Sequence, residues 1–165
     1  MGLTLRRAVL QDEAILRRWD SDPDVESSGG DDDNYDWHHE LARDVEWREF
    51  LLAEDDGVPV GMVVLIDACR EESHYWGDEV EPGAWAIDIW IGAPANRSRG
   101  LGTAMMQQAV RRCFERHGAS VVLIDPLQSN VRAIRFYERL GFAVVGPRRF
   151  GDDDCLVMSI SARCL

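Results

Sequence analysis

Apolar residues along this chain follow two periods, one typical of strands and one typical of helices. Strands are predicted where apolar residues alternate with polar ones or run together, at positions 3–9, 47–53, 58–67, 85–91, 119–124, 142–145 and 155–160. Helices are predicted where apolar residues recur every three or four positions, at 11–20, 37–45, 101–117 and 129–140, the last capped by Ser129. The polar segments between these elements are predicted to be loops, and the whole chain, residues 1–165, to be a single domain.

Three consecutive elements predict a parallel crossover inside a sheet that is otherwise mostly antiparallel. The segments at 85–91, 101–117 and 119–124 form a strand, a helix and a strand, and two strands joined through a helix normally lie parallel. Other strands follow each other through short turns such as Asp55-Asp56-Gly57, which favours antiparallel hairpins. We therefore expect an α+β fold, in which a mixed sheet carries helices on both faces.

The turn that leads into the helix at 101–117 gives the first indication of function. It reads Arg97-Ser98-Arg99-Gly100-Leu101-Gly102-Thr103. Glycines at two positions open the approach to the backbone, so the N–H groups of the first helical turn can point at an anion. The helix dipole and two arginines add positive charge. The turn predicts a phosphate site, although the same residues also suit a tight turn with solvated charges.

The charge of the chain changes sign along the sequence. The formal net charge is −12, and all 18 basic residues are arginine. Residues 1–96 carry 24 acidic and seven basic residues, whereas residues 97–165 carry six acidic and 11 basic residues. An acidic chain argues against nucleic acid as a partner. The asymmetry suggests one anionic and one cationic ligand, with solubilising acidic loops as the simpler alternative.

Neither a membrane segment nor a metal site is predicted. The longest apolar run, at 62–66, is too short to cross a bilayer, and no signal peptide is recognised, so we expect a cytoplasmic protein. Cysteines 69, 113, 155 and 164 lack the spacing of a zinc site and are predicted to be buried or unreactive thiols. The histidines at 38, 39 and 74 also lack the spacing of metal ligands.

Two spaced motifs give the chain a resemblance to a known family. The pattern Arg97-x-x-Gly100-x-Gly102 follows a strand, Asn130 lies near the start of the next helix, and Tyr137-Glu138-Arg139-Leu140-Gly141-Phe142 ends that helix. In this order the motifs resemble the GNAT superfamily of N-acetyltransferases over roughly residues 85–142. The resemblance implies a GNAT-like sheet with a splayed pair of parallel strands.

Within that superfamily, three segments are similar to the aminoglycoside 6'-N-acetyltransferases. They are the run at 124–134, the tripeptide Ala86-Ile87-Asp88, and the acidic and aromatic loop at 76–82. This similarity implies acetylation of an aminoglycoside, at the 6'-amine, with antibiotic resistance as the consequence. The alternatives are an N-acetyltransferase for a polyamine, a protein N-terminus or a siderophore precursor, and a non-catalytic acyl-CoA-binding module. The resemblance also leaves room for a homodimer.

The resemblance implies acetyl-CoA as co-substrate, without a metal. Its pyrophosphate would lie on the turn before the helix, its pantetheine arm would pair with the strand at 85–91, and Arg97 or Arg135 would meet the 3'-phosphate. The implied cofactor-binding residues are Ile89, Trp90, Ile91, Arg97, Arg99, Gly100, Leu101, Gly102, Thr103, Asn130 and Arg135.

Amine acetylation needs an amine without its proton, a polarised thioester and a proton for the departing thiolate. Tyr137 is implied as the proton donor, the alternative being an ordinary half-buried aromatic. Asp88 lies in an apolar strand, where a carboxylate needs a compensating partner. We predict that it orients the amine and accepts its proton; a buried arginine partner is the alternative.

Further acidic residues are predicted to bind the cationic substrate. Asp125 ends the neighbouring strand, so it should open toward the same side as Asp88 and anchor another ammonium, unless it caps a helix before Pro126. The loop at 68–83 places aromatic residues beside carboxylates, which suits a wall for a polar cation. Its predicted substrate-binding residues are Trp76, Asp78 and Glu79.

Overall fold

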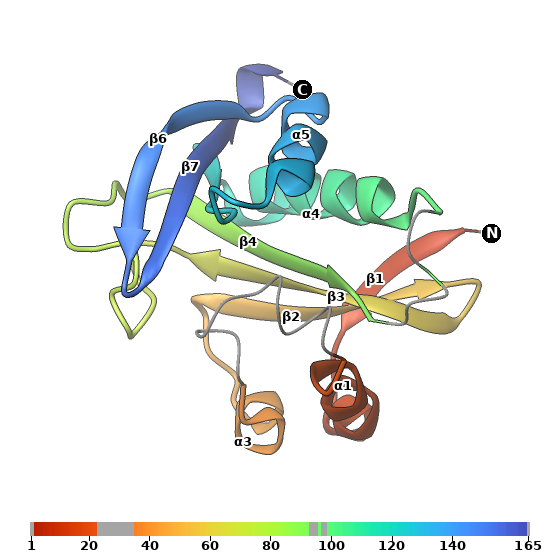
Figure 1. Cartoon of the computed structure of the whole chain (residues 1–165). Coiled ribbons are helices and arrows are strands. Elements are labelled where there is room, and N and C mark those ends of the chain that lie inside the picture. The colour runs from red at the N-terminus through yellow and green to blue at the C-terminus, as the bar shows by residue number, and fades with distance from the viewer. Residues whose placement is uncertain (1, 23–34, 93–95, 97–98, 165) are drawn as a thin grey trace. The chain divides into compact units, whose positions relative to one another are not determined.

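The computed structural model describes residues 2–22, 35–92, 96 and 99–164 (Figure 1). Its strands are β1 (Leu3–Arg7), β2 (Arg48–Asp55), β3 (Val58–Asp67), β4 (Ala84–Ile91), β5 (Val121–Ile124), β6 (Ala143–Phe150) and β7 (Asp153–Ser161). Its helices are α1 (Glu13–Asp20), α3 (Trp37–Ala42), α4 (Leu101–His117) and α5 (Val131–Arg139), with short 3-10 helices η1 (Leu10–Asp12) and η4 (Ala162–Cys164). Each predicted strand and helix is present.

The strands form one sheet in the order β1-β2-β3-β4-β5-β7-β6. Strands β4 and β5 are parallel, joined through α4 as the crossover predicts, whereas β1–β2, β5–β7 and β6–β7 pair antiparallel. This mixed, mostly antiparallel sheet confirms the predicted α+β class. None of the helices in the described part of the chain is both long and apolar enough to span a membrane.

The first compact unit consists of Met1–Val64 and Ile89–Gln108. It holds the end of β4 and the start of α4, the two segments that are predicted to bind the donor. Gly92, directly after β4, lies so close to the ring of Trp19 that a Cβ at this position would overlap it. Fully buried side chains form its core, among them Leu51, Leu52, Met62, Val63 and Met105.

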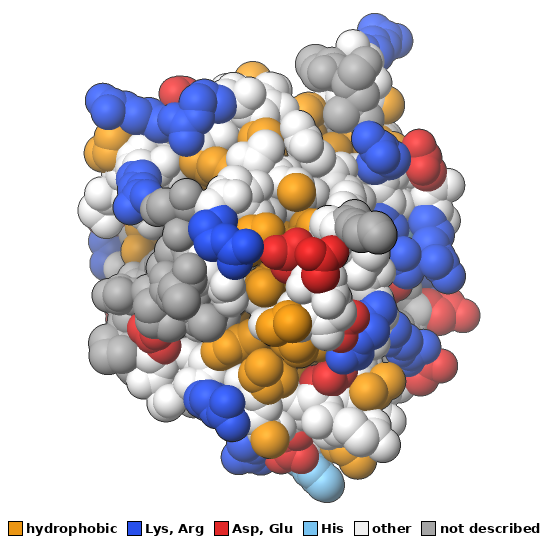
Figure 2. Space-filling model, turned by 90° about the vertical axis from the view of Figure 1, so that its right-hand side faces the viewer, with side chains coloured by type: hydrophobic (Ala, Val, Ile, Leu, Met, Phe, Trp, Pro, Cys, Tyr) orange, Lys and Arg blue, Asp and Glu red, His pale blue; other side chains and the backbone are white. Residues whose placement is uncertain are grey.

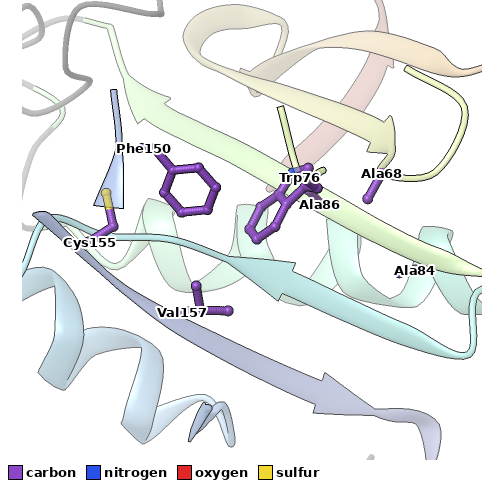
Figure 3. Close-up of a cluster of buried hydrophobic side chains, with 7 residues drawn as sticks. All are labelled: Ala68, Trp76, Ala84, Ala86, Phe150, Cys155 and Val157. Atoms are coloured by element: carbon purple, nitrogen blue, oxygen red, sulfur yellow. The ribbon is translucent and has the colours of Figure 1, made fainter. Parts of the chain in front are cut away.

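The second compact unit consists of Leu65–Asp88 and Ala109–Leu165. It holds the parallel pairing of β4 with β5, the hairpin β6–β7, helix α5, and the loop between β3 and β4. A hydrophobic cluster joins that loop to the strands, as Figure 3 shows. Its members are Ala68, Trp76, Ala84, Ala86, Phe150, Cys155 and Val157.

Two local predictions are wrong, each for a physical reason. Asn130, not Ser129, caps α5, because its Oδ1 accepts a hydrogen bond from the Ala133 N–H at 3.1 Å. Strand β6 continues well beyond residue 145, although Gly146 and Pro147 are typical strand breakers. A register shift between Val144 and Gly146 and the position of β6 at the sheet edge accommodate both residues.

Candidate active site

The turn before α4 has the backbone geometry of an anion site. Gly100 has φ +77°, a conformation that glycine adopts without strain, and α4 begins at the next residue. The Ala104 N–H donates to the Gly100 carbonyl at 3.3 Å, so the N–H groups of residues 101–103 precede the first hydrogen bond of the helix. Leu101 is buried, and Gly102 and Thr103 are half-buried.

The arginines predicted near the phosphates differ in their surroundings. Arg99 is exposed, and its guanidinium donates to Asn96 Oδ1 at 2.9 Å and to Asp55 Oδ2 at 3.2 Å. An exposed ion pair of this kind contributes little stability, so an anionic ligand can compete for Arg99. Arg135 is exposed on α5, whereas Arg97 lies outside the described residues.

Basic and acidic side chains are mixed on one face of the protein. On the face drawn in Figure 2, blue arginine side chains and red acidic side chains lie interspersed.

Strand β4 extends beyond its pairing with β5. The two strands share the pairs Ala84↔Val121, Trp85↔Val122 and Ala86↔Leu123, after which the described residues form no further β4–β5 pair. Strand β4 nevertheless runs on to Ile91, and its last residues, 88–91, are half-buried. This parting is the splayed parallel pair that the resemblance predicts, and it leaves one edge of the later β4 backbone for another partner.

Two carboxylates and two tyrosines of the second unit influence one another electrostatically. The Tyr75 hydroxyl, from the loop between β3 and β4, donates to Asp125 Oδ2 at 2.5 Å. Burial raises the pKa of Tyr137 on α5, and the charges of Asp88 and Asp125 raise it further. Burial also raises the pKa of Tyr75, followed by the charge of Asp125, the hydrogen bond to it, and smaller effects that include Asp88. We call these four residues the acid–tyrosine cluster.

The acid–tyrosine cluster can carry out proton transfer to and from a bound amine. Both tyrosine hydroxyls stay protonated at neutral pH because their pKa values lie above the ordinary value of 10.0. A carboxylate can hold an ammonium group and accept its proton, whereas a tyrosine hydroxyl can donate one. Asp125 accepts a hydrogen bond from Tyr75, so its carboxylate already has one polar partner in the cluster.

Sequence reasoning missed Tyr75 as a member of the cluster. The residue stands beside Trp76 in the acidic loop, but its partner Asp125 lies 50 positions further along the chain. No short-range spacing connects the two. The signal that was available is the polar, aromatic character of the loop itself.

The loop residues predicted to bind substrate lie in contrasting environments. Trp76 is only 5% exposed and packs edge-on against Phe150, with ring centroids 5.3 Å apart. Its ring belongs to the hydrophobic cluster, and substrate binding by Trp76 stays a prediction. Asp78 and Glu79 are exposed, and Asp78 Oδ1 lies 3.7 Å from His74 Nδ1.

Asn130 has a structural contact besides its predicted role at the donor. Its side-chain oxygen caps α5, and this bond does not use the NH₂ group of the same amide. The residue is half-buried. One side chain can therefore both cap the helix that carries Tyr137 and donate a hydrogen bond to a ligand.

Residues 8–150 match the acetyltransferase (GNAT) domain family, and the chain belongs to it. The predicted resemblance and the predicted enzyme class, an acyltransferase, are confirmed. Within the described residues, no group of three or more His, Cys, Asp or Glu side chains could hold a metal ion.

Comparison with individual proteins shows which acetyltransferases the chain is similar to. The chain is 29% identical over 148 residues to aminoglycoside N(6')-acetyltransferase type 1 of Klebsiella pneumoniae, covering 86% of this chain and 74% of the relative. It is 35% identical over 72 residues to a kanamycin resistance protein of Rhizobium radiobacter, covering 44% of this chain and 67% of the relative. The crystal structure of aminoglycoside acetyltransferase AAC(6')-Ib with coenzyme A and kanamycin matches with a TM-score of 0.86 and 26% identity, covering 99% and 96% of the two chains.

Proposed function

We propose that this protein transfers the acetyl group of acetyl-CoA directly to the 6'-amine of an aminoglycoside, and thereby inactivates the antibiotic. The observation that carries the proposal is the acid–tyrosine cluster, in which Asp125 accepts a hydrogen bond from Tyr75 and the charges of Asp88 and Asp125 help to raise the pKa of Tyr137. A polycationic amine is the substrate that such a site suits. The similarity to aminoglycoside acetyltransferases over most of the chain gives the same substrate class.

The donor is acetyl-CoA, as in the relative solved with coenzyme A. The N–H groups at the start of α4 suit its pyrophosphate, because a helix N-terminus offers unpaired donors and partial positive charge. The edge of residues 89–91 that no longer pairs with β5 suits the amides of the pantetheine arm, with Asn130 as a further donor. Arg97 and Arg135 are the candidates for the 3'-phosphate.

The reaction follows from the groups of the cluster. Asp88 holds the acceptor ammonium and takes its proton, directly or through water, and the freed nitrogen attacks the thioester carbonyl carbon. The carbon–sulfur bond then breaks, and the departing thiolate takes the hydroxyl proton of Tyr137. The nitrogen still carries one surplus proton after the attack, and it gives this proton to the phenolate, which restores the tyrosine and leaves a neutral amide. Ammonium groups of the acceptor, one at Asp88 and another at Asp125, offset the two charges that raise the pKa of Tyr137. The acceptor therefore makes the tyrosine a better acid when the proton is needed.

Acidic side chains outside the cluster assist the encounter with a polycation. Asp78 and Glu79 are exposed on the loop between β3 and β4. Exposed charges of this kind raise the local concentration of an oppositely charged ligand, and salt weakens the effect.

An acceptor assay tests the proposal. Enzyme and acetyl-CoA incubated with kanamycin or tobramycin should release the free thiol of CoA, and product mapping should place the acetyl group on the 6'-nitrogen. Asp88→Asn is the matched control, since it keeps the shape of the side chain and removes its charge and basicity. Thiol release with spermidine or a peptide N-terminus but with no aminoglycoside would assign the enzyme to a different acceptor.

Three broader features remain predictions. They are the single-domain organisation, a cytoplasmic location, and a homodimer in solution. Light scattering on the purified chain measures the last of these directly.

A further inference from the structure

Tyr75 is fixed at three different points. Its hydroxyl donates to Asp125 Oδ2 at 2.5 Å, and its backbone N–H donates to the carboxylate of Glu71. Its ring stacks on Phe150, with centroids 4.4 Å apart and planes only 6° from parallel. A tyrosine held by its backbone, its ring face and its hydroxyl has little freedom to turn away from its acceptor.

Two carboxylates stabilise the segment before Tyr75 by accepting hydrogen bonds from neighbouring residues. Asp67 Oδ1 accepts from the N–H groups of Cys69 and Arg70 at 3.1 and 3.2 Å. Glu71 is 5% exposed, and its Oε2 accepts hydrogen bonds from the N–H and the hydroxyl of Ser73 at 2.8 and 2.6 Å. The segment that delivers Tyr75 is therefore built by several local hydrogen bonds.

Phe150, on which the Tyr75 ring stacks, is also held in place by its neighbours. Phe150 is 5% exposed and lies beside Trp76 in the hydrophobic cluster of Figure 3. Arg148 of β6 donates to the Trp76 carbonyl at 3.0 Å, while its guanidinium lies 4.7 Å from the centre of the Phe150 ring. Strand β6 and the loop thus hold the stacked pair from two sides.

We propose that Tyr75 is a positioning residue for the acceptor, which holds the carboxylate of Asp125 in the one orientation that receives an ammonium group. This inference rests on the proposed function. An aspartate carboxylate rotates freely unless something fixes it, and a hydrogen bond from an immobile hydroxyl restricts that rotation. The carboxylate of Asp125 is already oriented before the acceptor binds, so no binding free energy is spent on orienting it.

The direction of the hydrogen bond supports this role. The pKa of Tyr75 is raised by burial and by Asp125, so the tyrosine remains the donor and the carboxylate the acceptor at neutral pH. The position of Tyr75 outside the donor-binding segments predicts that it affects the acceptor and leaves acetyl-CoA binding unchanged.

Tyr75→Phe is the test, because it keeps the ring on Phe150 and removes only the hydroxyl. We expect the KM for kanamycin to rise about tenfold, equivalent to about 1.4 kcal/mol, while the KM for acetyl-CoA stays the same. The value of kcat should change less than the KM for kanamycin. An unchanged KM for kanamycin in a folded, active variant would overturn the inference.

A double-mutant cycle with Asp125→Asn shows whether Tyr75 acts through Asp125. In the Asp125→Asn background, Tyr75→Phe should have no further effect on the KM for kanamycin. An equal additional rise in that background would contradict the inference. If the wild-type enzyme acetylates no aminoglycoside, the proposed function fails instead, and the two failures are thus distinguished. Thermal unfolding of each variant separates a loss of positioning from a loss of folded protein.

Discussion

Replacing Asn130 separates its two possible contributions, the cap of α5 and a hydrogen bond to the donor. Asn130→Ala removes both the side-chain oxygen and the NH₂ group. Asn130→Asp and Asn130→Ser keep an oxygen that can cap the helix, but neither has an amide NH₂ group. Serine adds no charge, so agreement between these two variants excludes an electrostatic artefact.

The size of the capping effect follows from the helix. Helix α5 has nine residues and none of them is fully buried, so packing alone holds it weakly. Loss of a cap hydrogen bond such as that from Asn130 Oδ1 to Ala133 costs about 1 kcal/mol. For a chain of this length, that free energy lowers Tm by about 2–4 °C.

The donor hydrogen bond is measured separately. Loss of one neutral hydrogen bond to pantetheine, about 1 kcal/mol, raises the KM for acetyl-CoA about fivefold. We expect Asn130→Ala to lower Tm and raise this KM, and Asn130→Asp and Asn130→Ser to recover Tm but not KM. Thermal unfolding and initial rates at varied acetyl-CoA give the two quantities.

Two results would refute this reasoning. An unchanged Tm in Asn130→Ala would mean that the cap contributes no stability. A wild-type KM in Asn130→Ser would mean that Asn130 does not contact the donor, and that its only role is to hold α5 and therefore Tyr137.

Three other changes have expected outcomes. Tyr137→Phe should lower kcat about 100-fold with little change in the KM for acetyl-CoA, as steady-state kinetics would show; an unchanged kcat would remove Tyr137 as the acid. Folding raises the pKa values of Tyr75 and Tyr137, so the free energy of unfolding should be constant with respect to these groups below about pH 10 and should decrease above it. The urea midpoint of the Tyr75→Phe/Tyr137→Phe variant should decrease less over the same pH range than that of the wild type. Gly92→Ala should cost about 1–3 kcal/mol in chemical unfolding, since its Cβ would overlap Trp19; a wild-type midpoint would show that the ring can move away.

Hydrophobic periodicity predicts most of the fold because each element carries its own pattern. The prediction for α4 matches the observed Leu101–His117, where Gly100 and Gly118 mark both ends. Strand β6 was predicted too short, since the register shift between Val144 and Gly146 is a property of the pairing with β7. Likewise, Ser129 and Asn130 are both good caps, and only the observed backbone distinguishes them.

For the candidate site, the sequence predicts which residues lie near one another where strand order determines their position. Asp88 lies in β4, and Asp125 directly follows β5, the parallel neighbour of β4. The charges of both carboxylates raise the pKa of Tyr137. Long loops follow no such rule. Trp76 turns into the hydrophobic cluster while Tyr75 turns toward Asp125, and which of two adjacent aromatics is buried depends on contacts with β6 that lie far along the chain.

If acetyl-CoA pairs with β4 where β4 parts from β5, it would stabilise the fold as well as take part in the chemistry. A pantetheine arm paired with Ile89–Ile91 would act as a neighbouring strand, so the amide protons of these residues should exchange with solvent more slowly once the donor is bound. At a concentration of 100 times its Kd, the donor would add about 2.7 kcal/mol to the free energy of unfolding. The metabolic supply of acetyl-CoA would then set both the rate of the enzyme and how long it survives heat or proteolysis.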